Sequence, residues 1–148
     1  MDDVLVLGAG PAGNNAALQL SRRGYRVTVV DRRQVIGDKL CTGIVSAECL
    51  RRFPADESHV LQEATSAEVY SPSGASLRMA REQPQAYVLD RVAYVQSFAD
   101  RARSAGAAYL LNHTVQSLSV DADGVSAVVA NGRGPEVLRA QAVVVASG

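Results

Sequence analysis

Three glycines near the start of the chain have the spacing of a turn that binds a phosphate group. Gly8, Gly10 and Gly13 follow the apolar residues 4–7 directly, and an alanine-rich segment follows them. In a strand–turn–helix unit, the first glycine allows the tight turn and the second lets the backbone approach a pyrophosphate. The third lets the helix pack closely on the strand. The spacing therefore predicts a nucleotide site at this turn.

The helix after the turn is expected to begin at Pro11, because proline lacks the N–H group that a first helical residue leaves unpaired. The anion donors then begin with the N–H groups of Ala12 and Gly13, at the positive end of the helix dipole. We expect small or apolar side chains at steps of four residues to face the sheet: Ala12, Ala16 and Leu20.

Asp31 ends a second apolar run, residues 27–30, and lies 18 residues after Gly13. A carboxylate at this place accepts hydrogen bonds from the hydroxyl groups of an adenosine ribose, and its charge repels a 2′-phosphate. The carboxylate therefore disfavours NADP as the ligand. Arg32 and Arg33 favour NADP, because they can bind its 2′-phosphate. We give the acid more weight, since arginines that follow a strand are most often solvated.

The remaining segments predict an α/β fold with a parallel sheet. The expected elements are a loop at 34–46, a helix at 47–53, a small hairpin insertion within 66–86, a strand at 87–89, a helix at 91–105 capped by Asp90, and a strand at 107–111. Strand-like runs at 115–120, 125–130 and 136–140 are separated by turn sequences, so they form an antiparallel three-stranded β-meander. A final parallel strand is expected at 141–146.

The order of the expected strands and helices along the chain distinguishes an FAD domain from an NAD domain. A plain NAD domain continues with alternating strands and helices, whereas here a meander precedes the last parallel strand. The pattern predicts a Rossmann-like FAD/NAD(P)-binding fold with FAD as the cofactor.

Composition excludes several other classes of protein. The 148 residues predict one domain, and 15 basic and 15 acidic residues give no net field that favours nucleic acid. The apolar runs are shorter than the roughly 20 residues of a membrane-spanning helix. A strand so close to Met1 leaves no room for a secretory signal, so we expect a cytoplasmic protein. Cys41 and Cys49 lack histidines at metal-ligand spacing, so no metal site is expected. We expect His59 and His113 to be surface or loop residues without a partner acid.

With these motifs, the chain resembles the FAD-binding half of the glutathione reductase and para-hydroxybenzoate hydroxylase superfamily. Within it, the sequence is most similar to the geranylgeranyl reductase group. The resemblance is carried by the glycine turn with Ala17, by Asp31-Arg32, and by the stretches 36–43, 89–91, 105–107 and 142–148.

The resemblance implies further cofactor contacts. The loop with Cys41, Thr42 and Ile44 would pass beside the flavin and ribityl chain, Arg91 would reach the cofactor, and the backbone of Val115 would contact adenine. Gly148, in the closing Ala-Ser-Gly, is a further expected cofactor residue. Two alternatives to these roles stay open. In one, Cys41 is a small hydrophobic residue buried in the core, and in the other, Arg91 is an ordinary surface residue of the helix.

The chain departs from the family pattern in places. Asn14 and Asn15 stand where small residues are commoner, and Asp31 stands where glutamate is commoner. Cys41-Thr42-Gly43 differs from the usual Cys-Gly-Gly run. Asn14 and Asn15 occupy the first turn of the predicted helix, and aspartate at 31 keeps the carboxylate but shortens its reach.

The resemblance implies an FAD-dependent oxidoreductase that transfers hydride or electrons to or from an apolar substrate, with NAD(P)H as one possible electron donor. One alternative is a class A flavin monooxygenase or halogenase, and another is a nucleotide-binding module without turnover. We expect the chain to be the FAD-binding part of a longer protein whose missing domain binds the substrate, so no catalytic residue is identified. Substrate, electron donor and oligomeric state are left open.

Overall fold

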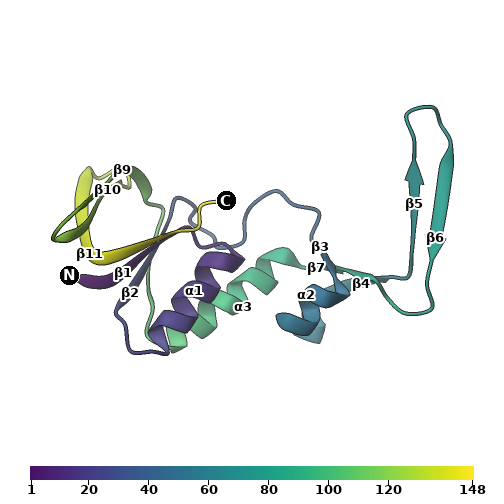
Figure 1. Ribbon diagram of the computed structural model, residues 1–148, viewed down its shortest axis with the longest axis horizontal. Helices are drawn as coiled ribbons and strands as arrows, with labels where there is room; N and C mark the ends of the chain where they lie inside the picture. The colour runs from purple at the N-terminus through teal and green to yellow at the C-terminus, as the bar shows by residue number, and fades with distance from the viewer. The chain divides into compact units, whose positions relative to one another are not determined.

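A computed structural model describes residues 1–148 (Figure 1). The chain forms two compact units. The first contains Met1–Asp38 and Val95–Gly148, and the second contains Lys39–Tyr94. The glycine turn and Asp31 belong to the first unit, whereas the cysteine loop and Arg91 belong to the second.

The first unit is built on a six-stranded sheet of order β8-β2-β1-β11-β10-β9. Its strands are β1 (Asp2–Leu7), β2 (Val27–Asp31), β8 (Ala108–Leu111), β9 (Thr114–Asp121), β10 (Gly124–Ala130) and β11 (Pro135–Val145). Pairs β1–β2, β2–β8 and β1–β11 are parallel, whereas β10 pairs antiparallel with both β9 and β11. The expected α/β fold with a parallel sheet and a three-stranded meander is confirmed.

Strand β11 differs from the expectation. We expected one strand at 136–140 and another at 141–146, but both belong to a single strand of 11 residues. Ala140 pairs with Val125 of β10 on one side and with Asp2 of β1 on the other. No glycine or proline interrupts the chain between Pro135 and Gly148, so nothing in the backbone ends the strand midway.

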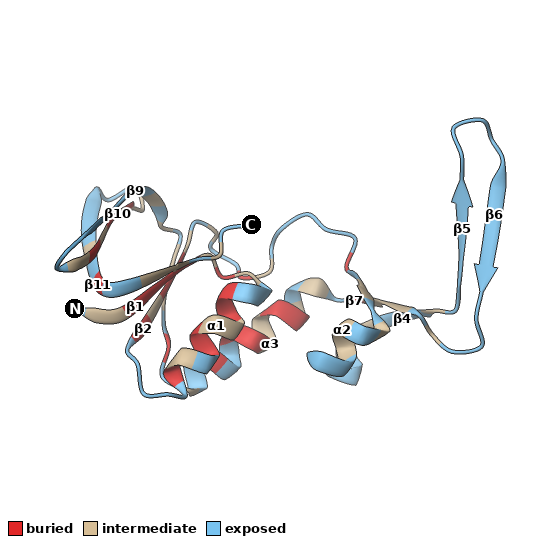
Figure 2. Ribbon diagram, viewed as in Figure 1, coloured by how far each residue is buried: buried red, intermediate tan, exposed pale blue.

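Alternate residues of β1 pack into two separate hydrophobic clusters, one on each face of the sheet. Val4 and Val6 contact a cluster that contains Ala17 of α1 (Pro11–Ser21) and Val95 of α3 (Arg91–Ser104). Leu5, on the opposite face, packs with side chains of the meander. Figure 2 shows the buried residues concentrated in β1, β2, α1 and α3. Each such buried aliphatic side chain contributes roughly 1.5–3 kcal/mol to folding.

Helix α1 presents a different face to the sheet than we expected. Its buried residues are Gly13, Asn14, Ala17, Leu18 and Ser21, whereas Ala12 is exposed. Of the expected stripe of Ala12, Ala16 and Leu20, Leu20 packs against the core and Ala16 is half-buried, whereas the expectation is wrong for Ala12. The reason is the close approach of Gly13 to the turn, since a side chain there would overlap the Gly8 carbonyl group. That contact turns the helix so that Gly13 and the residues four positions apart face the strands.

The second unit contains a three-stranded sheet of order β3-β7-β4 and a separate hairpin. Its elements are β3 (Ile44–Ser46), α2 (Ala47–Arg52), the 3-10 helix η1 (Glu57–His59), β4 (Val60–Ala64), β5 (Ser66–Tyr70), β6 (Ser76–Ala80) and β7 (Ala86–Leu89). The predictions of a helix at 47–53 and of a hairpin are confirmed. The hairpin is formed by β5 and β6 alone, and β7 pairs elsewhere. Strands β3 and β4 were missed because both are short and mostly polar or exposed.

Both long helices begin and end where the sequence predicts. The Asp90 side chain accepts a hydrogen bond from the Ala93 N–H at 3.0 Å, as an N-cap does. Gly24 and Gly106, which follow α1 and α3, have φ angles of 85° and 102°. No helix of the structure combines the length and the apolar character needed to cross a bilayer.

Candidate functional site

The three glycines of the turn have different surroundings. Gly8 has a φ angle of 112°, and a side chain there would overlap the backbone of Ala146, the residue that follows β11. A side chain at Gly13 would overlap the Gly8 carbonyl group, whereas one at Gly10 would meet no atom of the chain within 4 Å. The fold itself thus requires Gly8 and Gly13. Gly10 instead leaves open space beside the backbone, which is the space that a bound group needs.

The start of α1 offers hydrogen-bond donors. Gly10 is the N-cap, no side chain caps the helix, and no acidic residue lies in its first turn. Pro11 occupies the first helical position, as expected. The N–H groups of a first helical turn have no intrahelical acceptor, so those of Ala12 and Gly13 are available to an anion.

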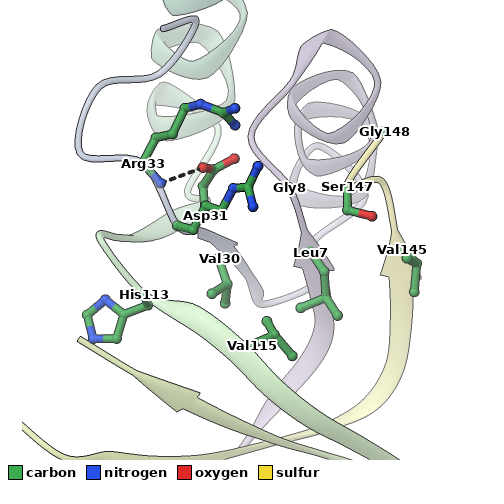
Figure 3. A pocket seen from close by; sticks show the side chains of 11 residues that line it. Leu7, Gly8, Val30, Asp31, Arg33, His113, Val115, Val145, Ser147 and Gly148 are labelled. Atoms are coloured by element: carbon green, nitrogen blue, oxygen red, sulfur yellow. Dashed lines mark hydrogen bonds between the residues drawn. The ribbon is translucent and has the colours of Figure 1, made fainter. Parts of the chain in front are cut away.

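Asp31 binds two backbone N–H groups with its carboxylate. Oδ2 accepts from Ala9 N–H and Oδ1 accepts from Arg33 N–H, both at 2.8 Å, and Figure 3 shows the second of these bonds. The first bond joins the end of β2 to the glycine turn. Sequence reasoning missed this role, because it placed Asp31 only as an acceptor for a ribose. Each carboxylate oxygen has a second lone pair, so both functions are compatible.

A cavity of about 450 Å³ opens beside this carboxylate. It lies at the carboxyl ends of β1, β2 and β11, where ligands of open α/β sheets bind. Five of the predicted residues line it: Gly8, Asp31, Arg32, Val115 and Gly148. The others are Leu7, Val30, Arg33, His113, Val145 and Ser147. In Figure 3, Asp31 and Ser147 stand on opposite sides of the cavity, above the apolar side chains of Leu7, Val30 and Val115.

His113 has partners that the sequence did not predict. Its Nδ1 lies 2.7 Å from the Leu111 carbonyl oxygen and therefore donates, and its Nε2 lies 2.8 Å from Asn131 Nδ2. Asn131 Oδ1 accepts from Arg133 N–H, which fixes the amide with Nδ2 toward the ring. Glu136 Oε1 lies 3.4 Å from Nε2. His113 is a loop residue, as expected, but an acid does lie beside its ring, which was not expected. The bonds of the ring to Leu111 and Asn131 tie the start of β9 to the β10–β11 turn.

A fully buried asparagine and a half-buried tyrosine form a pair behind the turn. Asn14 is fully buried, and its Nδ2 donates to the Ala9 carbonyl oxygen at 2.9 Å. Tyr109 of β8 donates its hydroxyl proton to Asn14 Oδ1 at 2.8 Å. Burial raises the pKa of Tyr109 to about 12, although the Arg103 guanidinium over its ring acts in the opposite direction. The phenol is therefore a stable donor at neutral pH.

This pKa predicts how stability depends on pH. The pKa of Tyr109 is about 12 in the folded chain against 10.0 for an ordinary tyrosine, so the unfolded chain loses the proton first. The stabilisation is complete below pH 10 and is lost as the pH rises through 12. We expect the free energy of unfolding, measured with urea, to fall over this range. Tyr109→Phe should make the fall shallower, and an identical slope in this variant would contradict the assignment.

The predicted residues of the second unit form their own cluster. Arg91 Nη1 donates to the Lys39 carbonyl oxygen at 3.0 Å. The loop before β3 is also bound to β7, because Leu89 N–H donates to the Gly43 carbonyl oxygen at 2.9 Å. Gly43 has a φ angle of 72°, and a side chain there would lie 2.7 Å from the Leu89 carbonyl oxygen. The conformation of this loop thus depends on glycine at 43 and on Arg91.

Cys41 lies exposed in this loop, so the alternative of a buried hydrophobic residue is wrong. The Gly43 N–H group lowers the pKa of the Cys41 thiol most, and the Arg91 charge and the Thr42 hydroxyl and N–H groups lower it further. Thr42 Oγ1 also lies 3.5 Å from the Ile44 nitrogen, which donates to it. The arrangement favours the thiolate form of Cys41.

The lowered pKa predicts selective alkylation. We expect iodoacetamide at neutral pH to modify Cys41 several times faster than Cys49, because the thiolate is the reactive form and Cys41 is the more exposed thiol. Peptide mass spectrometry after timed quenching gives the two rates. Arg91→Met should slow the reaction of Cys41 and leave that of Cys49 unchanged. Equal rates in the unmodified chain would show that the loop does not activate this thiol.

Comparisons with known proteins identify the family of this chain. Residues 3–148 match the family described as FAD dependent oxidoreductase. The chain belongs to this family. It is 34% identical, over 152 aligned positions, to a digeranylgeranylglycerophospholipid reductase of Methanosarcina acetivorans. The alignment covers 99% of this chain and 37% of that protein, so the chain spans well under half the length of this relative.

Solved structures share the fold of this FAD-dependent oxidoreductase chain. A geranylgeranyl bacteriochlorophyll reductase-like protein of Thermoplasma acidophilum has a TM-score of 0.86 and 27% identity, over 99% of this chain and 39% of the other. A p-nitrophenol 4-monooxygenase of Pseudomonas putida has a TM-score of 0.79 and 21% identity, over 100% and 41%, and shows the fold alone. The resemblance to geranylgeranyl reductases and the expectation of FAD as the cofactor are confirmed.

Proposed function

We propose that residues 1–148 are the FAD-binding domain of a flavoenzyme of the geranylgeranyl reductase type, acting on an apolar, isoprenoid-like substrate. The observation that carries the proposal is the cavity that Gly8 of the glycine turn, Asp31 and the residues at the end of β11 line at one edge of the parallel sheet. The names of the reductase relatives support the substrate class. NAD(P)H is the proposed source of electrons, and the proposed location is the cytoplasm.

The residues of the first unit fit the ADP part of FAD. The N–H groups of Ala12 and Gly13 would bind the pyrophosphate, and the open space beside Gly10 admits it. Asp31 would accept from the ribose hydroxyl groups with its remaining lone pairs. Val115 would lie beside the adenine, and Gly148 would line the far side of the cavity. Arg32 is exposed and would contribute positive charge at the rim.

The residues of the second unit are proposed to contact the flavin. Thr42 and Ile44 would border the ring and the ribityl chain through the loop that Gly43 and Arg91 hold in place. Cys41 would lie with its thiol exposed in the same loop. FAD, when bound, supplies the hydride chemistry, so the domain needs to bind and orient it rather than to provide an acid–base pair.

A titration with FAD tests the proposal. We expect quenching of flavin fluorescence on addition of the chain, with ADP competing for the same site and NADP competing poorly because of Asp31. A chain that binds NADH but neither FAD nor ADP would overturn the proposal. Binding of FAD with no electron transfer when the domain is joined to the remainder of a reductase relative would instead favour a nucleotide-binding module.

A second candidate is a flavin monooxygenase or halogenase, which the fold shared with the p-nitrophenol 4-monooxygenase favours. Oxygen uptake separates the two, because a monooxygenase consumes oxygen in step with substrate whereas a reductase does not. We expect a protein that contains this domain to reduce its substrate without stoichiometric oxygen consumption.

A further inference from the structure

The orientation of one peptide group in the glycine turn depends on a buried side chain. The Ala9 carbonyl oxygen accepts from Asn14 Nδ2 at 2.9 Å, and Asn14 is 0% exposed. In a trans peptide the carbonyl and the N–H point in opposite directions. Holding the Ala9 carbonyl toward the interior therefore aims the N–H of Gly10 away from it, toward the open side of the turn.

The preceding peptide group is held by different residues. Ala9 N–H donates to Asp31 Oδ2 at 2.8 Å, and the Gly8 carbonyl faces the close contact with Gly13. Two successive peptide groups of the turn thus have fixed orientations in the chain without a ligand. Among the residues that hold these two peptide groups, Asn14 is the one whose hydrogen bond sets the direction of the Gly10 N–H.

Tyr109 determines how Asn14 is oriented. Its hydroxyl donates to Asn14 Oδ1 at 2.8 Å, across 95 positions of sequence. If the amide were rotated by half a turn, Oδ1 would face the Ala9 carbonyl oxygen, and two acceptors would oppose each other. The phenol is protonated at neutral pH, and burial raises its pKa further, to about 12. The ring is also held in place by Arg103, whose guanidinium carbon lies 4.5 Å from the ring centroid.

We propose that Asn14 and Tyr109 are positioning residues that direct the Gly10 N–H at the pyrophosphate of the bound nucleotide. The two side chains form a relay from β8 through α1 to the turn, and neither lines the cavity. The inference rests on the proposed FAD site. It assigns a function to a fully buried asparagine that directly follows the glycine turn.

The test compares ligands with and without a pyrophosphate. Isothermal calorimetry with ADP and with adenosine is performed on the full chain and on Asn14→Leu, which has a similar volume but no polar group. We expect ADP affinity to fall by about 10- to 100-fold, since two buried hydrogen bonds are lost, and adenosine affinity to change by less than about 3-fold. The ³¹P resonances of bound ADP should also shift, which a change in stability alone would not cause.

Tyr109→Phe is the second variant, because it removes only the hydroxyl group and keeps the ring beside Arg103. We expect it to fold and to lose ADP affinity by about 3- to 10-fold. Asn15→Ala, at the neighbouring half-buried position, is the matched control and should bind ADP as the unmodified chain does. Equal losses for ADP and adenosine, or unchanged ADP affinity in both variants, would overturn the inference. Failure of the unmodified chain to bind ADP would overturn the proposed function instead.

Discussion

Gly13→Ala is expected to abolish FAD binding and to destabilise the first unit by about 3 kcal/mol or more. The added methyl group would overlap the carbonyl group of Gly8, which is backbone and cannot rotate away as a side chain can. The helix would have to move away from β1, so the N–H groups of its first turn would no longer lie where the pyrophosphate is proposed to bind. Circular dichroism during urea unfolding measures the loss of stability, and flavin fluorescence measures binding.

Gly10→Ser is the matched comparison for this prediction. A side chain at this position meets no atom of the chain within 4 Å, and Gly10 already has the extended backbone of an N-cap, with φ of −75°. Serine caps helices well, so the stability should be equal or higher. FAD affinity should nevertheless fall by roughly 10-fold or more, because the serine hydroxyl would occupy an N–H group that the pyrophosphate needs. If both glycine variants kept their affinity, the turn would not be the phosphate site.

Asp31→Ala is the second large effect that we expect. The substitution removes the acceptor of Ala9 N–H and of Arg33 N–H, and it removes the proposed acceptor for the ribose. Loss of charge-assisted hydrogen bonds of this kind costs about 1 to 3 kcal/mol in binding of ADP-ribose and a similar amount in stability. Calorimetry with ADP-ribose and urea unfolding of the same sample give the two quantities.

Asp3→Ala provides a control with similar chemistry away from the cavity. Asp3 Oδ2 accepts from Arg26 N–H at 2.7 Å, and Oδ1 lies 3.0 Å from Arg26 Nη2. Its carboxylate therefore also joins β1 to the segment before β2, but at the opposite end of the strands. We expect a small loss of stability and unchanged affinity for ADP-ribose. Unchanged affinity in Asp31→Ala as well would contradict the placement of the ribose.

The main elements of the first unit were predictable because their signals are local. Pro11 starts one helix and Asp90 caps the other through bonds within a few residues, and glycines follow both helices. Turn sequences likewise placed the meander. The short strands β3 and β4 carry no such signal, since their pairing with β7 rather than their own composition makes them strands.

The candidate site was predictable only in part. Gly8, Asp31, Val115 and Gly148 line one cavity, although they come from four separate strands or strand ends. The juxtaposition of Gly8, Asp31 and Gly148 follows from the parallel order of β1, β2 and β11, whereas Val115 lies in β9, which pairs antiparallel with β10. The hydrogen-bond partners of Asp31 within the chain could not be predicted, because the position of an aspartate in the sequence does not specify which backbone N–H groups its carboxylate binds.

The sequence by itself determined the family and the cofactor class. The glycine spacing, the acid after the second strand and the turns of the meander can each be recognised in a short stretch of sequence. Only the tertiary structure decided how the turn is held. Asn14 and Tyr109 are 95 positions apart, and the face that α1 buries is set by the contact of Gly13 with Gly8. Periodicity predicts that a helix has a buried face, but steric contact with the strand selects which one.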